Sequence, residues 1–235
     1  MRLYIIRHAE PDYPNNTITK RGHREAKALA DRMKNEGLTQ IYSSPLGRAL
    51  HTAQYTSKAL GIPVKIEEWT KELSNLRMGN IPPWGDLIAW DLPGEILRKQ
   101  DSLLTHKNWD QIPYLTNPRF RRETAKVARR SDGFLKHHGF RRIGGRYQVL
   151  KPNRERIAVF CHGGFGLTWL SHLLAIPIPL MWSGFWMAPS SVTTILFDER
   201  SQRWATPRCI GFCDVSHLRS KGLSVSPHGI KANFD

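Results

Sequence analysis

An Arg-His pair directly follows the first apolar run of the chain. Residues 3–6 form a run that is too short for a helix and predicts a buried strand, which stops at Arg7 and His8. In an open parallel sheet, chemistry gathers just beyond the carboxyl ends of the strands. A cation beside an imidazole suits an anionic substrate and a nucleophile whose pKa lies near neutrality. Such pairs are common, so this one gains meaning only from the residues at the ends of the other strands.

Two further predicted strands end in complementary residues. Residues 40–43 predict a short strand that turns into a helix, with Ser44 as the N-cap. Arg48 then falls in the first helical turn, where free amides and the helix dipole favour an anion. Residues 156–161 predict another buried strand, which ends at His162 and precedes two glycines that permit close backbone approach. Two Arg and two His therefore stand at the ends of three strands.

The order and spacing of these motifs resemble the histidine phosphatase superfamily, in its phosphoglycerate-mutase-like branch. The matching motifs are Arg7-His8-Ala9, Ser43-Ser44-Pro45 with Arg48-Ala49 and Thr52-Ala53, His162-Gly163-Gly164, and the helix start Thr19 to Ala26. The resemblance spans most of the chain and is specific, because several independent motifs agree. It implies an α/β fold, a three-layer α/β/α sandwich around a mainly parallel sheet, and a phosphohistidine intermediate.

The resemblance also implies roles for the strand-end residues. His8 is the expected nucleophile, and Arg7, Arg48 and His162 are expected to hold the phosphoryl oxygens. The helix after His162 begins on Gly163, so its free amides can face the phosphate.

An Asn in the loop after the first strand usually contacts the phosphoryl group in this family. Asn15 and Asn16 are both candidates here, and the sequence does not choose between them.

A carboxyl group is needed to protonate the leaving oxygen, and the resemblance places it after the strand at residues 64–66. Glu72 matches best, although the Gly that commonly follows the acid closely is displaced to Gly79. Glu67 and Glu68 are therefore competitors, since a general acid must lie within hydrogen-bond reach of the leaving group.

A long insertion is expected between this acid and the last motif strand. The chain of 235 residues is long enough for one α/β domain, and we predict a single domain over residues 1–235 with a helical cap insertion at about 75–153. Trp84, Trp90 and Trp109 lie in the insertion, where core packing is the preferred interpretation and pocket lining the alternative.

The strong positive charge is concentrated in one segment. The formal net charge is +15, and residues 96–156 hold 16 Lys or Arg against 5 Asp or Glu. A solvated basic helix is the favoured interpretation, followed by a positive rim for phosphorylated substrates, with a nucleic-acid surface third.

The remaining composition predicts a cytoplasmic protein. There is no apolar run long enough to span a bilayer and no signal peptide ahead of the first strand. Cys161, Cys209 and Cys213 form no metal-type pair and are interpreted as reduced thiols. No metal or cofactor is expected, because Arg and His groups already surround the phosphate. The oligomeric state cannot be derived from the sequence.

The predicted function is metal-independent hydrolysis of a small phosphorylated metabolite. The first alternative is a phosphoglycerate-type phosphomutase, which uses the same core residues but needs a second phosphate site and exclusion of water. The second is a non-catalytic module with a basic binding surface. A nucleophile and an acid together argue against that module.

Overall fold

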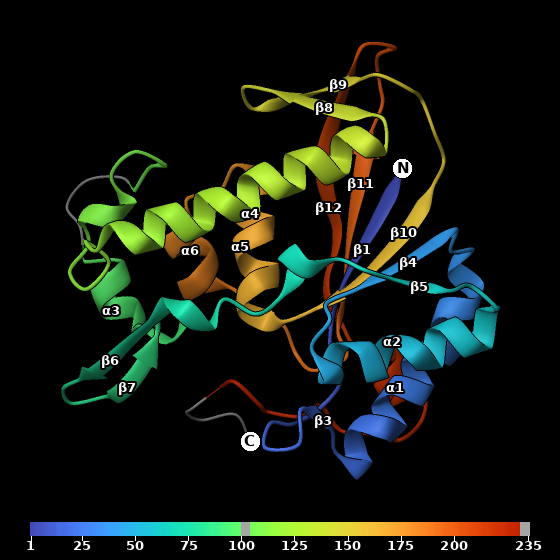
Figure 1. Ribbon diagram of the computed structural model, residues 1–235, viewed down its shortest axis with the longest axis horizontal. Coiled ribbons are helices and arrows are strands. Elements are labelled where there is room, and N and C mark those ends of the chain that lie inside the picture. The colour runs from blue at the N-terminus through green and yellow to red at the C-terminus, as the bar shows by residue number, and fades with distance from the viewer. Residues whose placement is uncertain (100–103, 231–235) are drawn as a thin grey trace.

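The computed structural model describes residues 1–99 and 104–230, and within them a mixed sheet forms the centre of the molecule (Figure 1). Its eight strands stand in the order β5-β4-β10-β1-β11-β12-β9-β8. In chain order they are β1 Arg2–Arg7, β4 Gln40–Ser43, β5 Val64–Ile66, β8 Phe140–Ile143, β9 Arg146–Val149, β10 Arg156–Cys161, β11 Val192–Asp198 and β12 Trp204–Asp214. Two small antiparallel pairs lie outside it, namely β2 Pro11–Asp12 with β3 Thr17–Ile18 and β6 Arg77–Ile81 with β7 Gly85–Ile88.

Helices cover both faces of the sheet, which confirms the α/β sandwich. The α-helices are α1 Lys20–Met33, α2 Gly47–Leu60, α3 Gly94–Leu97, α4 Pro118–His137, α5 Gly163–Leu174, α6 Ile178–Gly184 and α7 Ser216–Arg219. Short 3₁₀ turns lie at η1 Lys34–Glu36, η2 Glu68–Thr70, η3 Ser74–Leu76, η4 Ala89–Asp91 and η5 Trp109–Gln111. In Figure 1, α1 and α2 lie on one side of the sheet and α4 and α5 on the other.

The alternation of side chains along β1 builds these layers. Leu3 and Ile5 belong to the cluster that includes α5, whereas Tyr4 and Ile6 pack with Leu29 of α1. Successive residues of a strand point to opposite faces, so a strand that is apolar at every position is buried on both sides. The apolar run at residues 3–6 is therefore a central strand.

Parallel pairing is confined to one half of the sheet. β5, β4, β10 and β1 pair in parallel, whereas β11, β12, β9 and β8 add antiparallel pairs. The expectation of a mainly parallel sheet holds for the half that carries the predicted site. It does not hold for the other half, because a hairpin and the C-terminal strands extend the sheet there.

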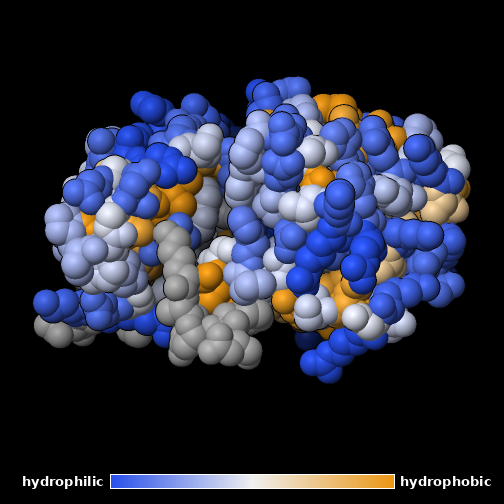
Figure 2. Space-filling model, turned by 90° about the horizontal axis from the view of Figure 1, so that it is seen from below, coloured by the Kyte–Doolittle hydropathy of each residue, from blue (hydrophilic) through white to orange (hydrophobic). Residues whose placement is uncertain are grey.

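The segment expected as a helical cap is divided between two locations. Its later part, α4, β8 and β9, joins the central sandwich, since β9 pairs with β12 and α4 packs against α5. Its earlier part, residues 77–117 apart from 100–103, holds β6, β7 and α3 and packs against α6. Figure 2 shows a hollow between the side carrying these elements and the side carrying α1 and α2. The single-domain organisation stays a prediction.

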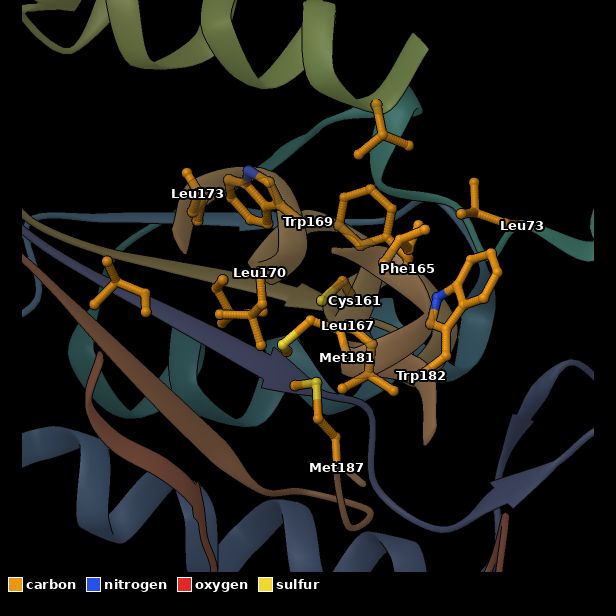
Figure 3. Packing of buried hydrophobic residues seen from close by; sticks show 14 of the residues in the cluster. Leu73, Cys161, Phe165, Leu167, Trp169, Leu170, Leu173, Met181, Trp182 and Met187 are labelled. Atoms are coloured by element: carbon orange, nitrogen blue, oxygen red, sulfur yellow. The ribbon is translucent and has the colours of Figure 1, made fainter. Parts of the chain in front are cut away.

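The core around α5 joins the insertion to the sheet. Phe165, Trp169 and Leu170 of α5 lie beside Cys161 of β10 and Trp182 of α6 (Figure 3). Trp109 of the insertion is buried against Trp182, with the ring centroids 6.2 Å apart. Core packing is therefore the correct interpretation for Trp109, while Trp84 is exposed at the surface.

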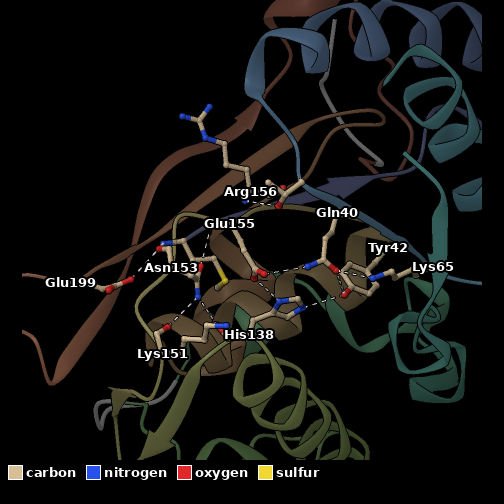
Figure 4. A network of polar contacts seen from close by, with 11 residues as sticks. Gln40, Tyr42, Lys65, His138, Lys151, Asn153, Glu155, Arg156 and Glu199 are labelled. Atoms are coloured by element: carbon tan, nitrogen blue, oxygen red, sulfur yellow. Dashed lines mark hydrogen bonds and ion pairs between the residues drawn. The ribbon is translucent and has the colours of Figure 1, made fainter. Parts of the chain in front are cut away.

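A polar network ties α4 to the sheet at the amino ends of β4 and β10 (Figure 4). His138 bonds to Tyr42 Oη through Nε2 at 3.2 Å and to Glu155 through Nδ1 at 2.7 Å. Gln40 accepts from Tyr42 and donates to Glu155. Both ring nitrogens of His138 are thus occupied in holding the end of α4, at the edge opposite to the strand ends that carry Arg7 and His162.

Candidate active site

The parallel register of β1, β10 and β4 brings the predicted residues together. Arg7 pairs with Cys161 across the β1–β10 ladder, so the next residues, His8 and His162, leave the sheet side by side. Their ring centroids lie 5.1 Å apart. Ser44 follows β4 and donates its backbone N–H to the carbonyl of Phe160 on β10. Three strand ends therefore converge because parallel strands end at the same edge of a sheet.

The His8 ring is held in the tautomer that a nucleophile requires. Its Nδ1 lies 2.7 Å from the carbonyl oxygen of Ala9, which can only accept, so Nδ1 carries the proton. Nε2 then keeps its lone pair and accepts from Nε of Arg48 at 3.3 Å. Burial, with a further contribution from the Arg7 charge, holds the pKa of His8 well below its ordinary value. The ring is neutral at pH 7 and presents an unprotonated nitrogen.

The guanidinium of Arg7 lies in the site, and only some of its N–H groups donate hydrogen bonds to described residues. The side chain is 5% exposed, and one terminal nitrogen donates to the backbone carbonyls of Met187 and His228. Its Nε has no hydrogen-bond partner among the described residues. A Cβ built on Gly163 would lie 3.4 Å from this Nε, so Gly163 leaves room beside it. Nε of Arg7 is therefore free to donate to an acceptor that enters the site.

His162 has one ring nitrogen fixed and one without a partner. Its Nε2 lies 2.9 Å from the Ser44 hydroxyl, which itself accepts from the backbone of Leu46. The hydroxyl keeps a hydrogen to donate and a second lone pair with which to accept, and its donation to Nε2 would put the imidazole proton on Nδ1. This buried Nδ1 has no partner in the described part of the chain. Burial, with the nearby His8, holds the pKa of His162 well below its ordinary value, so the ring is neutral at pH 7.

The prediction of Ser44 as the N-cap of α2 was wrong. The helix begins at Gly47 with Leu46 as the N-cap, because Ser44 still follows the β4–β10 ladder and its hydroxyl bonds to His162. Arg48 nevertheless lies in the first turn of α2, as expected.

Glu72 reaches the site, whereas its two competitors do not. Its carboxylate accepts from the amides of Gly164 at 3.1 Å and Phe165 at 2.7 Å, at the start of α5. Burial raises its pKa above the ordinary value, against the lowering effect of these amides and of Arg7. Glu67 instead accepts from the Trp69 indole, and the exposed Glu68 pairs with Lys71. The α5 amides expected to face phosphate are thus partly taken by the carboxylate.

The loop asparagines lie farther from the histidines. Asn15 is exposed and bonds through its backbone and side chain to Asp12. Asn16 is also exposed and adopts a left-handed conformation at φ 48°, with its carbonyl against Gly47 at the start of α2. No contact links either side chain to His8 or Arg7 among the described residues, so their substrate-binding role stays a prediction.

Two neighbours of the site were not predicted from the sequence. Arg48 lies over the Tyr13 ring, with Cζ 5.1 Å from the centroid, and Tyr13 in turn contacts the ring of His228. Both residues stand in segments without periodicity, where sequence patterns carry little spatial information.

Trp90 covers the start of α5. A Cβ on Gly164 would meet its indole at 2.4 Å, which explains why a glycine is needed there. Trp90 is partly buried and packs against the core cluster that includes α5, which agrees with the preferred core-packing interpretation.

The basic segment forms a groove beside the site. A cavity of about 1000 Å³ runs between the η2 region and α4, and its lining includes Glu72, Lys126, Arg129 and Arg130. Glu123 neutralises Lys126 and Arg122 in part, since it pairs with both. The basic face of α4 is solvent-exposed, which fits the predicted solvated helix.

The described residues contain neither a candidate metal cluster nor a candidate membrane span. No group of three or more His, Cys, Asp or Glu residues there has the arrangement of a metal site. No helix in the same residues is long and apolar enough to cross a membrane.

Comparison with known proteins places the fold and the family. The family model described as "Histidine phosphatase superfamily (branch 1)" matches residues 3–209. A relative named "Probable phosphoglycerate mutase GpmB" from Photorhabdus laumondii is 29% identical over 82 residues, which cover 31% of this chain and 38% of that protein. The match therefore spans less than half the length of this curated relative.

Solved structures match over nearly the whole chain. A phosphoserine phosphatase from Entamoeba histolytica, in complex with 3-phosphoglyceric acid, superposes with a TM-score of 0.62 at 21% identity, covering 92% of this chain and 98% of that one. The α-ribazole phosphatase from Shigella flexneri gives 0.54 at 21% identity, covering 92% and 97%. At this level of identity the likeness shows the shared fold.

Proposed function

Because the chain belongs to the histidine phosphatase superfamily (branch 1), we propose that it is a phosphomonoesterase that acts through a phosphohistidine on a small phosphorylated metabolite. The observation that carries the proposal is the His8 ring, whose Nδ1 is bonded to a carbonyl and whose Nε2 is unprotonated beside Arg48. A neutral, oriented imidazole next to two guanidinium groups suits attack on a phosphoryl group.

In the first step, Nε2 of His8 attacks phosphorus in line with the leaving oxygen. Arg7, Arg48 and His162 donate hydrogen bonds to the phosphoryl oxygens, whose charge must be stabilised in the transition state. The proposal is supported by the buried, unpartnered Nε of Arg7 and Nδ1 of His162 among the described residues. The P–O bond breaks as the P–N bond forms, and the leaving alkoxide takes a proton from Glu72.

In the second step, water attacks the phosphohistidine. Glu72, now a carboxylate, accepts a proton from this water, and His8 leaves with its electron pair restored on Nε2. The raised pKa of Glu72 supports a carboxyl group that is protonated for the first step. In these two steps, side chains of this chain transfer every proton and bind every phosphoryl oxygen. The proposal therefore includes no metal or cofactor.

A phosphomutase is the second candidate, because the curated relative from Photorhabdus laumondii is called a probable phosphoglycerate mutase. A mutase has to return the phosphoryl group to a second position of the substrate and exclude water meanwhile. The two solved neighbours from Entamoeba histolytica and Shigella flexneri are called phosphatases, which favours hydrolysis. A non-catalytic basic module has little support, because the nucleophile and the acid lie in one site.

The proposal includes a cytoplasmic location and no nucleic-acid partner. The three cysteines are unpaired, as expected where thiols stay reduced. Carboxylates line the groove beside α4 together with its basic residues, among them Glu67, Glu68 and Glu123, and they disfavour a nucleic-acid backbone.

The test is hydrolysis of p-nitrophenyl phosphate in the presence of EDTA by the wild type and by His8→Ala. Metal-independent turnover that disappears in the variant is expected. Ordinary activity in His8→Ala would overturn the nucleophile assignment. Interconversion of 2- and 3-phosphoglycerate without release of phosphate would select the mutase instead, and salt-sensitive RNA binding without any turnover would select the binding module.

A further inference from the structure

Residues 215–230, called the tail below, run from the end of β12 to the candidate site. Leu218 and Leu223 are buried against Ala28 of α1. Arg21 of α1 donates to both the carbonyl and the hydroxyl of Ser224. The backbone is therefore anchored on α1 several residues before it reaches Arg7.

At the site, the tail backbone closes around the Arg7 guanidinium. The carbonyl of His228 accepts from one terminal nitrogen of Arg7 at 3.1 Å, and the carbonyl of Met187 accepts from the same nitrogen. Gly229 follows at φ +96°, and a Cβ there would lie 3.4 Å from the other terminal nitrogen. Nε of Arg7 has no hydrogen-bond partner in the described residues.

Tyr13 connects this arrangement to the second arginine. Its ring centroid lies 5.3 Å from that of His228 and 5.1 Å from Cζ of Arg48. The three side chains therefore run in sequence from the tail to the guanidinium that contacts the nucleophile.

Neither arginine forms an ion pair in the described residues, although the Glu72 carboxyl acts on both electrostatically. In residues 1–99 and 104–230, no ion pair involves Arg7 or Arg48, although ion pairs hold many of the surface arginines. An unpaired guanidinium keeps its charge for a ligand, but a long side chain without partners loses rotamer freedom when the ligand binds. Neutral carbonyl and aromatic contacts orient it without neutralising it.

Building on the phosphatase function proposed above, we propose that His228 and Gly229 of the tail, together with Tyr13, form a clamp that positions Arg7 and Arg48 for the phosphoryl group. The clamp residues are positioning residues, because they act through the two arginines. Pre-orientation of the donors lowers the entropic cost of substrate binding. The ligand of the two positioned arginines is a phosphoryl dianion. Binding of inorganic phosphate therefore tests the clamp without turnover.

The first experiment compares Gly229→Val with Gly222→Val. Both glycines lie in the tail at positive φ, +96° and +64°, so a valine strains the backbone at each. At Gly229 the side chain points at Arg7 and at Trp186, whereas at Gly222 nothing lies within 4 Å. We expect Gly229→Val to weaken inorganic phosphate binding and to raise KM for p-nitrophenyl phosphate, each by about tenfold. Gly222→Val is expected to keep the wild-type phosphate affinity and KM, because its side chain meets no neighbour.

The second experiment uses Tyr13, which is 51% exposed, so its substitution does not threaten the fold. Tyr13→Ala removes the ring contacts with both His228 and Arg48, and we expect weaker phosphate binding and a raised KM. Tyr13→Phe keeps the ring contacts but loses the hydroxyl that interacts with Arg7, so it should restore part of the affinity. A purely structural role for the tail would change the melting temperature without this pattern in KM and phosphate affinity.

The outcomes separate the clamp from the function. Wild-type turnover with unchanged phosphate affinity in Gly229→Val and in Tyr13→Ala overturns the clamp and leaves the phosphatase standing. If Gly229→Val does not fold, the Tyr13 variants alone decide. If the wild type binds phosphate but does not turn over, the proposed function fails while phosphate binding still tests the clamp. If the wild type neither binds phosphate nor turns over substrate, the clamp and the proposed function are both overturned.

Discussion

Nε of Arg48 lies 3.3 Å from Nε2 of His8, so a guanidinium N–H donates to the lone pair that would attack phosphorus. The contact is compatible only with a neutral imidazole at this nitrogen. A phosphoryl group entering the site has to replace this hydrogen bond, and it offers Arg48 a more strongly accepting, charged oxygen in exchange.

Arg48→Lys is expected to lower kcat/KM by about a hundredfold, although the positive charge is retained. Lysine lacks the planar group that contacts the Tyr13 ring and that we propose to hold the phosphoryl oxygens. The measurement is steady-state hydrolysis of p-nitrophenyl phosphate. Arg24→Lys, an exposed change on α1, is the matched control. Equal kcat/KM in Arg48→Lys and the control would show that charge alone suffices at this position.

For an alkyl phosphate, whose leaving group needs a proton, the pH profile of kcat/KM is expected to be bell-shaped with a mildly acidic optimum. His8 has to be neutral, and its pKa is lowered from 6.5, so activity falls only as the pH drops below that lowered value. Glu72 has to be protonated, and its pKa is raised from 4.5, so activity falls as the pH rises above that raised value. A profile that keeps rising to alkaline pH would contradict the assignment of Glu72.

Glu72→Gln separates the general acid from its competitors. The amide cannot supply a proton, so we expect kcat/KM for an alkyl phosphate, which reports the formation of the phosphohistidine, to fall by about a thousandfold. The loss should be much smaller for p-nitrophenyl phosphate, whose leaving group needs no protonation. Glu67→Gln is the control, because that carboxylate bonds to Trp69, and it should keep near wild-type rates on both substrates. Equal losses on the two substrates in Glu72→Gln would point to a structural role.

Ser44→Ala tests how the His162 tautomer is fixed. Removal of the hydroxyl leaves Nε2 of His162 without its partner, so the proton is free to leave Nδ1 and the phosphoryl donor is lost in part. We expect kcat/KM to fall about tenfold with little change in KM. Ser43→Ala is the matched control, since that buried hydroxyl bonds to the carbonyl of Ser44. A similar fall in both variants would indicate a packing effect.

His217 makes the folded state sensitive to acid. Burial lowers the pKa of this side chain to about 4, with Arg32 also lowering it and Asp214 opposing. Because the unfolded chain takes up the proton near 6.5, stability falls as the pH drops below that value, by about 2 kcal/mol at pH 5. In His217→Gln the free energy of unfolding should change less between pH 7 and pH 5 than in the wild type. Exposed His23→Gln should leave that difference unchanged.

Local patterns were enough for the strand-end residues of the site. Arg7, His8 and His162 each follow a run of buried residues, and a parallel ladder of two such runs leaves the following side chains adjacent. The apolar run and the polar residues that end it are consecutive in the sequence, so both can be identified from it. That is why the central half of the sheet and these strand-end groups could be derived without coordinates.

The sequence left a choice among three carboxylates that only the tertiary structure resolved. Glu67, Glu68 and Glu72 lie within one short segment, and periodicity does not say which of them points toward α5. The amides of Gly164 and Phe165 select Glu72, because a helix start offers free N–H donors and the two carboxyl oxygens of Glu72 accept from them. These contacts join residues that lie 92 and 93 positions apart in the chain.

By itself the sequence determined the strand of the proposed nucleophile, the two arginines and the order of the motifs, since each rests on neighbours along the chain. The tertiary structure alone decided that β8 and β9 extend the sheet, and that Tyr13 and His228 meet beside Arg7 and Arg48. Arg7 and His228 are 221 positions apart, and His228 lies in an aperiodic segment, so their contact depends on burial and hydrogen bonds that form as the chain folds. The surroundings of the reacting atoms therefore depend on long-range packing that no local pattern encodes.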